Sequence, residues 1–402
     1  FKGIQPNGSF EYRFKVRQNG TYWYHAHSKG QEQDGLYGAL VIYPKGKQPV
    51  AQHEKADRDY VVMLSDFHET NSDQIMANLK KSAEYYQNQR ETVGDVWQQV
   101  KQKGLKATWQ DRSMWNQMRM LKTDLSDVTG YTFLVNGKTP QQNWTGAFSA
   151  GEKVRLRFIN ASAMSFFDVR IPNLKMTVVS ADGQPVKPVA VDEFRIGAAE
   201  TYDVIVEPKQ AHYQIEAESI DRSGFAIASL QRDTVAPPAQ IEMPKVRPRA
   251  LLTMQDMGMD HGTHAQMDMK DMNHSAHTAM NMSDMDHSTH DSMKMGNMNE
   301  MHQQQMTSQH ENVKSESVQG WANASTPTGH KALQYADLKS LTPQPDTRPA
   351  ERELVIRLGG NMERYMWTMN GKKFSDAEPL QVKYGERIRL KFINDSMMAH
   401  PM

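Results

Sequence analysis

The chain has 402 residues, and its 47 lysine and arginine residues balance its 47 aspartate and glutamate residues. This balance gives no electrostatic reason to expect a nucleic-acid or an acidic-lipid partner. The sequence has no cysteine, which excludes thiol chemistry and disulfides within it, and no apolar run approaches the roughly 18 residues that a helix needs to cross a bilayer.

Residues 1–44 have the pattern of β-strands. The Asn-Gly pair at 19–20 is a hairpin signal, and residues 21–27 and 35–43 predict the two strands that follow it. Before the pair, residues 10–16 alternate between apolar and charged side chains, which predicts a half-buried strand. The apolar side chains of that strand are Phe10, Tyr12, Phe14 and Val16.

Two histidines, His25 and His27, end the strand predicted over residues 21–27. Because alternate side chains of a strand point to the same face, their imidazoles would lie side by side. Imidazole is a suitable ligand for copper, zinc, iron and nickel. On spacing alone two surface histidines are the commoner case, and the aromatic residues 22–24 before them also suit a plain core role. The remainder of the chain decides between these alternatives.

A second β unit begins at residues 59–64 and continues to about residue 208. Its short alternating strands, separated by Gly, Pro and Asn turns, indicate a sandwich or a barrel. A stretch of different character interrupts the unit at about 72–122, is rich in Lys, Gln, Glu and Ala, and has no proline. Its apolar residues suit amphipathic helices, and they are Ile75, Met76, Leu79, Tyr85, Val93, Val96 and Trp97.

A third β unit begins near residue 351 and repeats the second. Residues 131–138 match residues 365–372, and residues 151–160 match residues 385–394, both at an offset of 234 residues. The constant offset means that the register is continuous, so the chain holds two copies of one β domain.

The same register places Phe166 of the second unit opposite His400 of the third. One copy therefore has an apolar residue where the other has a candidate metal ligand. A terminal His-Pro-Met triplet is usually a loop, but here it follows a strand that both copies share. A metal site in one copy and an apolar plug in the other is a result that gene duplication can produce.

The stretch between the second and third units is rich in methionine and histidine over residues 254–306, where four tandem units of 13 residues begin with Met and repeat Met at the sixth position. The residues between its methionines and histidines are mostly polar. The segment therefore cannot bury enough apolar area to offset chain entropy, and we expect disorder without a ligand. Thioethers prefer Cu(I), and histidine adds affinity for Cu(II); the alternative is a linker enlarged by repeat slippage. The candidate copper-recruiting residues are Met254, Met257, Met259, His261, His264, Met267, Met269, Met272, His274, His277, Met280, Met282, Met285, His287, His290, Met293, Met295, Met298 and Met301.

Together these residues resemble multicopper oxidases, which are built from three cupredoxin domains, and most closely the periplasmic copper-resistance protein A family. The resemblance rests on the motifs at 20–28, 31–33 and 35–38, on the helical interruption, on the Met/His-rich stretch and on the closing residues 400–402. It covers nearly the whole chain.

The resemblance implies a mainly β fold of tandem cupredoxin-like Greek-key β-sandwiches, with a helical insertion in the second and a disordered Met/His-rich segment before the third. It also implies that the chain is a fragment lacking both ends, with the remaining copper motifs, including the copper-binding cysteine, outside it. The implied domains are the C-terminal part of domain 1 at 1–50, domain 2 at 59–233, a linker at 234–345 and the N-terminal part of domain 3 at 346–402.

By the same resemblance, His25 and His27 are ligands of the type 3 copper pair, one for each copper, and His400 is a ligand of the type 1 copper. Four coppers are expected in the full-length protein: type 1, type 2 and the type 3 pair. The implied reaction is oxidation of Cu(I) to Cu(II), with phenols as a further substrate class, coupled to four-electron reduction of O2 to water. We expect the fragment alone to be inactive. The histidines that match no ligand spacing are His53, His68, His212 and His330.

The partners that the resemblance implies are Cu(I), Cu(II) and O2, with a periplasmic copper carrier as a further candidate, and the implied location is the periplasm. Two other functions stay open: a copper-sequestering protein that stores the metal without significant turnover, and a laccase-like oxidase of phenols. Oxygen uptake on adding Cu(I) separates the first from an oxidase, and phenol turnover without added copper supports the second. A nitrite reductase fits less well, because those chains usually have two cupredoxin domains.

Overall fold

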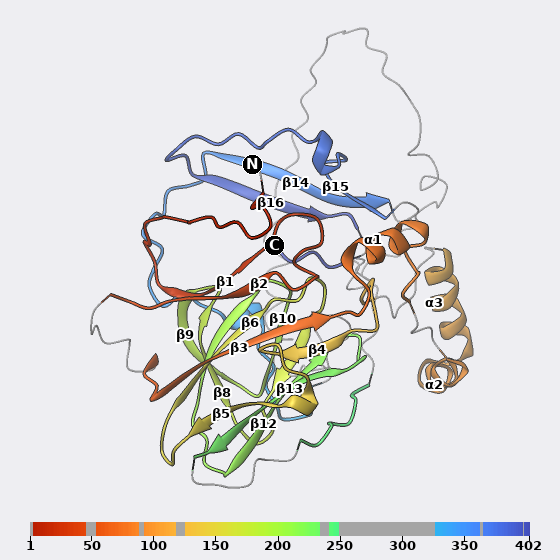
Figure 1. Ribbon diagram of the computed structural model, residues 1–402. Coiled ribbons are helices and arrows are strands. Elements are labelled where there is room, and N and C mark those ends of the chain that lie inside the picture. The colour runs from red at the N-terminus through yellow and green to blue at the C-terminus, as the bar shows by residue number, and fades with distance from the viewer. Residues whose placement is uncertain are drawn as a thin grey trace, which may run out of the picture.

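The computed structural model describes residues 3–45, 54–87, 92–117, 125–233, 241–248, 326–361, 365–396 and 398–402. Within these residues the fold is mainly β, as the sequence predicts, with four sheets and a group of helices to one side (Figure 1). The Met/His-rich segment 254–306, on which the copper-recruitment prediction falls, lies outside the described residues.

The elements follow in chain order. The strands are β1 (Gly20–His25), β2 (Tyr37–Ile42), β3 (Arg58–Phe67), β4 (Thr132–Val135), β5 (Trp144–Phe148), β6 (Val154–Asn160), β7 (Phe167–Arg170), β8 (Met176–Ala181), β9 (Gln184–Val191), β10 (Glu193–Ile196), β11 (Thr201–Val206), β12 (His212–Ser219), β13 (Phe225–Arg232), β14 (Arg352–Asn361), β15 (Met366–Met369) and β16 (Ile388–Asn394). The helices are α1 (Ser72–Lys81), α2 (Val93–Lys103) and α3 (Leu105–Gln117), with short 3-10 turns η2 (Pro140–Gln142), η5 (Tyr335–Asp337) and η6 (Phe374–Asp376).

The second unit is a sandwich of two sheets. One sheet has the strand order β4-β3-β6-β11-β8-β9, and the other has the order β10-β7-β12-β13-β5. Pairing is antiparallel except between β3 and β6 and between β13 and β5. Alternate side chains of both sheets point inward and build one apolar core, whose largest fully buried members include Phe148, Phe158, Phe167 and Phe194.

The third unit repeats part of this architecture, because its sheet β15-β14-β16 has the order of β4-β3-β6. The hydrogen bonds repeat as well. The side chain of Asn136 accepts a bond of 2.8 Å from the amide of Met63, and the side chain of Asn370 accepts one of 2.8 Å from the amide of Arg357. The internal duplication predicted from the offset of 234 residues is therefore confirmed in the backbone.

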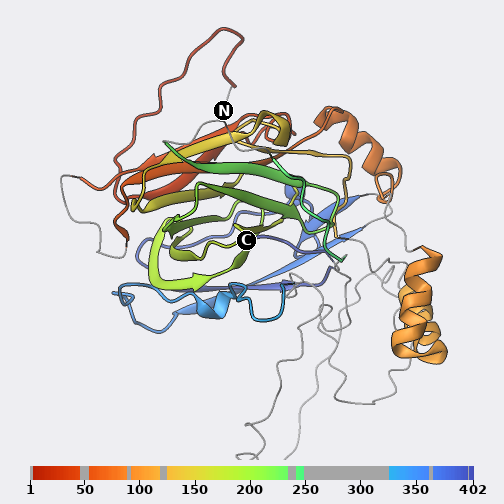
Figure 2. The same ribbon diagram turned by 90° about the horizontal axis from the view of Figure 1, so that it is seen from below.

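The predicted helical interruption is confirmed in its described part. Asn71 caps α1 and Thr92 caps α2 through side-chain oxygens, and α1 buries Ile75 and Leu79. Tyr85 lies in a turn outside the helices, and the helical residues Met76, Val93 and Trp97 are exposed. The last two lie on α2, which packs against α3, and this pair projects from the molecule in both views (Figures 1 and 2). No helix within the described ranges is long and apolar enough to cross a membrane.

The predicted half-buried strand over residues 10–16 is not formed. Phe10, Tyr12, Phe14 and Val16 are between 51% and 72% exposed, and the backbone there belongs to no strand. Alternation predicts only which side chains would share a face. A strand also needs a neighbour for its amides and carbonyls, and no described strand pairs with this segment.

The β1–β2 hairpin is fixed to the second unit by a buried polar contact. The Thr21 hydroxyl donates to Asp203 at 2.7 Å and accepts from Arg157 at 2.8 Å, and Arg157 also donates twice to Asp59. Thr21 is fully buried. In Figure 1 the hairpin lies between the sandwich of the second unit and the sheet of the third. The strand that carries His25 is thus held in place from the second unit.

Candidate metal centre

The two histidines predicted as type 3 copper ligands lie close together. The ring centroids of His25 and His27 are 4.4 Å apart, and the ring planes are inclined by 36°. Sequence reasoning placed both residues on one strand, but β1 ends at His25 and His27 lies two residues beyond it, with an exposed side chain. The two imidazoles are adjacent although the strand has ended.

The ring of His25 is fixed on two sides. The indole of Trp23 stacks on it, with centroids 4.1 Å apart and planes inclined by 15°, and Nδ1 lies 2.6 Å from Oε2 of Glu32. A carboxylate can only accept, so Nδ1 donates and the lone pair of the neutral ring is on Nε2. Within the described residues no hydrogen bond engages Nε2 of His25 or either ring nitrogen of His27. An imidazole with one nitrogen held by a carboxylate and the other unengaged suits copper.

The third predicted ligand, His400, follows β16. Its Nε2 lies 2.7 Å from the Ser396 hydroxyl, and the ring of Trp367 packs edge-on against it at 4.7 Å. Burial lowers the pKa of His400, against an opposing effect of the nearby Asp127 carboxylate. A lowered pKa favours the neutral imidazole, which is the form that binds metals.

A buried hydrogen bond joins the second and third units beside His400. The Tyr365 hydroxyl donates to Asp127 at 2.7 Å, and burial raises the pKa of Asp127 while this bond and His400 lower it. A cavity of about 160 Å³ lies here, lined among others by Met164 and Met398. Sequence reasoning missed Asp127, because it follows the helical insertion without any motif.

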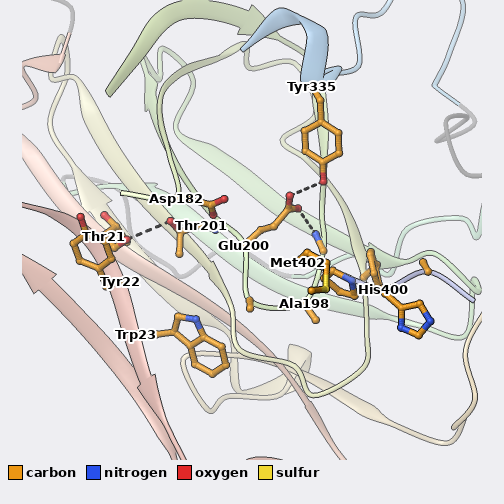
Figure 3. A pocket seen from close by; sticks show the side chains of 15 residues that line it. Thr21, Tyr22, Trp23, Asp182, Ala198, Glu200, Thr201, Tyr335, His400 and Met402 are labelled. Atoms are coloured by element: carbon orange, nitrogen blue, oxygen red, sulfur yellow. Dashed lines mark hydrogen bonds between the residues drawn. The ribbon is translucent and has the colours of Figure 1, made fainter. Parts of the chain in front are cut away.

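A larger cavity of about 780 Å³ is bordered by all three β units (Figure 3). Trp23 of β1 lines it, together with Glu200 of the second unit and His400 at the end of the third. Glu200 accepts hydrogen bonds from the Tyr335 hydroxyl at 2.5 Å and from the Gly197 amide at 2.6 Å. His25 and His27 do not line this cavity, whereas Thr21, Tyr22 and Trp23 of β1 and His400 do. The described part of the chain contains no group of three or more His, Asp or Glu side chains arranged to hold a metal.

The second unit has a different arrangement at the position equivalent to His400. There the loop carries Phe166, as the register predicts, and Asp66 fastens it. The Asp66 carboxylate accepts hydrogen bonds from the amides of residues 163–165, at 3.0 to 3.3 Å, and from the Ser165 hydroxyl at 2.8 Å. In this unit a loop that carries Phe166 and is fastened by Asp66 thus takes the place of the His400 loop.

The third unit has no carboxylate at the equivalent position. The registers of β3 with β6 and of β14 with β16 place Gly360 where the second unit has Asp66. A Cβ atom at Gly360 would lie 2.8 Å from the ring of Trp367. That ring is the one that packs against His400. The loop of His400 keeps the other fastening of the second unit: the Asn394 amide donates to the Met398 carbonyl at 2.7 Å, as the Asn160 amide donates to the Ser165 carbonyl at 2.7 Å.

The Asp66 carboxylate makes stability depend on pH. Burial raises the pKa of Asp66 to about 6, against the effect of the bonds from Ser165, Ala163 and Met164, whereas the value in an unfolded chain is about 3.9. The folded protein therefore binds a proton between about pH 4 and 6 that the unfolded chain releases, so this group favours folding increasingly as the pH falls through that window. The measurement is the difference in free energy of unfolding between the wild type and Asp66→Asn at pH 7 and pH 4. We expect the wild type to gain relative to the variant on acidification, and a constant difference would contradict this.

The comparisons with known proteins define the class first. Three family models, each described as multicopper oxidase, match residues 1–47, 58–234 and 347–402. Copper resistance protein A of Escherichia coli is 48% identical over 431 residues, a match that covers 100% of this chain and 70% of that protein. The copper resistance protein A homolog of Pseudomonas syringae pv. tomato is 48% identical over 417 residues, covering 100% of this chain and 69% of that protein. The chain belongs to the copper resistance protein A family of multicopper oxidases.

Other matches are more distant. The multicopper oxidase MmcO of Mycobacterium tuberculosis is 25% identical over 399 residues, covering 99% of this chain and 60% of that protein. A laccase structure from Botrytis aclada is 25% identical, with a TM-score of 0.39, and covers 59% of this chain and 39% of that one. The predicted resemblance and the mainly β fold class are confirmed, and the family implies copper as cofactor. The domain boundaries and the copper roles of single residues stay predictions.

Proposed function

We propose that the protein is a periplasmic copper-tolerance oxidase, which oxidises Cu(I) to Cu(II) and passes the electrons to O2. The names of the relatives, copper resistance protein A, support the link to copper tolerance. The observation that carries the proposal is the pair of adjacent imidazoles at His25 and His27, each with an unengaged nitrogen within the described residues. Two neutral imidazoles 4.4 Å apart can serve two neighbouring coppers.

The roles follow from the contacts. His25 and His27 would hold the type 3 copper pair, one copper each, and His400 would hold the type 1 copper. Four bound coppers (type 1, type 2 and the type 3 pair) would supply the one-electron redox steps that together reduce O2 to water. The Trp23 ring covers one face of His25 and limits water there, and Ser396 holds Nε2 of His400 so that Nδ1 is left for the metal.

The Met/His-rich segment 254–306 would recruit copper for this reaction, and a periplasmic copper carrier would be a source of the metal. The described residues on its two sides are fastened to one strand. Arg247, before the segment, donates to the Glu193 carboxylate at 2.7 and 2.8 Å, and Leu333, after it, donates its amide to the Glu193 carbonyl at 2.9 Å. Tyr335 then reaches Glu200 at the cavity that His400 lines. The described residues that follow the segment therefore come near the proposed electron entry, which supports this role.

Deletion of residues 254–306 is expected to remove most of the Cu(I) or Ag(I) that the protein binds beyond its four coppers. Methionine thioethers and histidines are numerous there, and both are copper ligands. Equilibrium dialysis against Ag(I) measures this. The control replaces the segment by a Gly/Ser sequence of equal length, and equal Ag(I) binding by deletion, control and intact protein would reject the role.

Oxygen uptake tests the oxidase itself. The complete, copper-loaded protein should consume O2 when Cu(I) is added, with four Cu(I) oxidised for each O2 reduced to water. Copper binding without oxygen uptake would point to storage. Rapid phenol oxidation that needs no added copper, together with slow Cu(I) oxidation, would point to a laccase-like enzyme.

A further inference from the structure

The loop between β1 and β2 carries three consecutive polar side chains, those of Glu32, Gln33 and Asp34, and each of them bonds to a different partner. The loop is compact: the amide of Ala26 donates to the carbonyl of Leu36 at 3.0 Å, and the amide of Leu36 donates to the carbonyl of Gln31 at 2.9 Å. The amide of Asp34 also donates to Gly30 at 3.0 Å. These bonds fix the backbone of residues 31–34, and so decide where their side chains point.

The first of the three side chains, Glu32, turns back toward the candidate copper ligand. Its Oε2 accepts from Nδ1 of His25 at 2.6 Å, and the two side chains are about equally shielded, with 25% of the imidazole and 26% of the carboxylate exposed. This bond selects the tautomer, because it keeps the proton on Nδ1 and the lone pair on Nε2. Together with the stacked Trp23 it also fixes the direction in which Nε2 points.

The next two side chains fasten the loop to the second unit. Gln33 donates to the Asp66 carbonyl at 3.1 Å and accepts from the Tyr131 hydroxyl at 3.1 Å. Asp34 accepts from the amide of Ser72 at 2.8 Å and from its hydroxyl at 2.6 Å. Ser72 is the first residue of α1, so Asp34 satisfies an amide that the helix leaves unpaired and lies where the helix dipole favours a negative charge.

We propose that Glu32 is a positioning residue that presents Nε2 of His25 to copper, and that the helical insertion of the second unit sets its position through Asp34. The inference rests on the proposed role of His25 as a copper ligand. It gives the insertion a function at a site to which it contributes no ligand. Groups that hold the second nitrogen of a ligating histidine are typically worth about 10–100-fold in metal affinity or activity.

The test reads the tautomer of His25 and needs no copper. In histidine-labelled protein, long-range proton–nitrogen spectra report which ring nitrogen carries the proton, and His25→Gln identifies the signals. The wild type should show Nδ1–H at His25, Glu32→Ala should show a mixture of tautomers, and Glu32→Gln should restore Nδ1–H because its amide oxygen still accepts. Glu69→Gln, the same change at an exposed glutamate, is the control.

A second readout is copper retention by the complete protein during dialysis against a chelator. Glu32→Ala should release copper at roughly 10–100-fold lower chelator concentration than the wild type, with Glu32→Gln in between. Asp34→Ala, which leaves Glu32 in place, should move both readouts in the same direction.

An unchanged tautomer and unchanged copper retention in Glu32→Ala would overturn the role of Glu32, and unchanged readouts in Asp34→Ala would overturn the role of the insertion. If the wild type fails to consume O2 with Cu(I), the proposed oxidase function falls. The tautomer measurement still tests Glu32 in that case.

Discussion

Replacing His25 or His27 by alanine is expected to lower Cu(I)-driven oxygen consumption by the copper-loaded protein more than about 100-fold. Loss of a ligand should exceed the roughly 10–100-fold that loss of a ligand's supporting group costs. The imidazoles lie 4.4 Å apart, and among the described residues the only ring contacts of His25 are with Trp23 and His27. Oxygen-electrode rates and copper content per chain, measured on the same preparations, check the expectation.

The matched control for this experiment is His330→Ala. His330 is exposed and belongs to the segment after the Met/His-rich stretch, so its loss should leave both rate and copper content as in the wild type. If the His25 and His27 variants keep wild-type copper content and rate, the assignment of the type 3 ligands is wrong. A loss of oxygen consumption with full copper retention would also contradict a ligand role.

Replacing Asp168 by alanine is expected to lower the free energy of unfolding by about 3–5 kcal/mol. Asp168 has no exposed surface, and its carboxylate accepts from Arg195 at 2.7 Å and from Arg222 at 2.8 Å, with Arg247 3.4 Å away. Removal of the carboxylate leaves buried guanidinium groups with fewer counter-charges, and an uncompensated buried charge is costly. Denaturant unfolding followed by circular dichroism measures the loss.

The same carboxylate predicts a pH dependence. Burial acts to raise the pKa of Asp168, but Arg195, Arg222 and Arg247 outweigh it, so the pKa lies below the ordinary value. Its contribution to stability is therefore present above about pH 4 and is lost only as the pH falls below that range.

The control for the denaturant unfolding of Asp168→Ala is Asp376→Ala. This variant removes an exposed carboxylate and should have the same unfolding midpoint as the wild type. An Asp168→Ala midpoint equal to that of the control would contradict the prediction.

The repeated β domain could be predicted from the sequence because two independent signals agreed. Alternation of apolar and polar residues predicted the strands, and the constant offset of 234 residues predicted which residues of the two units are equivalent. The structure agrees, because Asn136 and Asn370 accept matching hydrogen bonds from backbone amides. The exposed stripe at residues 10–16 shows the limit of alternation, since it cannot reveal whether a neighbouring strand is present. Exposure of Val93 and Trp97 has the same cause, because a helical pattern does not specify what a helix packs against.

The candidate metal site was predictable only in part. His25 and His27 were found by spacing and His400 by the repeat, since each belongs to a local pattern. Glu32 lies in the motif at 31–33 without any sign of its partner, and Ser396 and Asp127 belong to no motif; the contacts of all three arise from loop geometry. The one usable signal was position: Glu32 lies in the loop that joins the two strands of the histidine hairpin.

The carboxylate and phenyl closure at Asp66 and Phe166 has a consequence for biosynthesis. Hydrogen bonds from Ser165 to Asp66 hold this loop with protein groups alone, so the central module would need no metal for its packing. A cell starved of copper would then accumulate a polypeptide whose middle is complete, and nascent chains would not compete for scarce ions while folding. Copper that binds later would then stabilise only the first and third units. The rise in unfolding temperature that calorimetry measures on copper binding should therefore be confined to those two units.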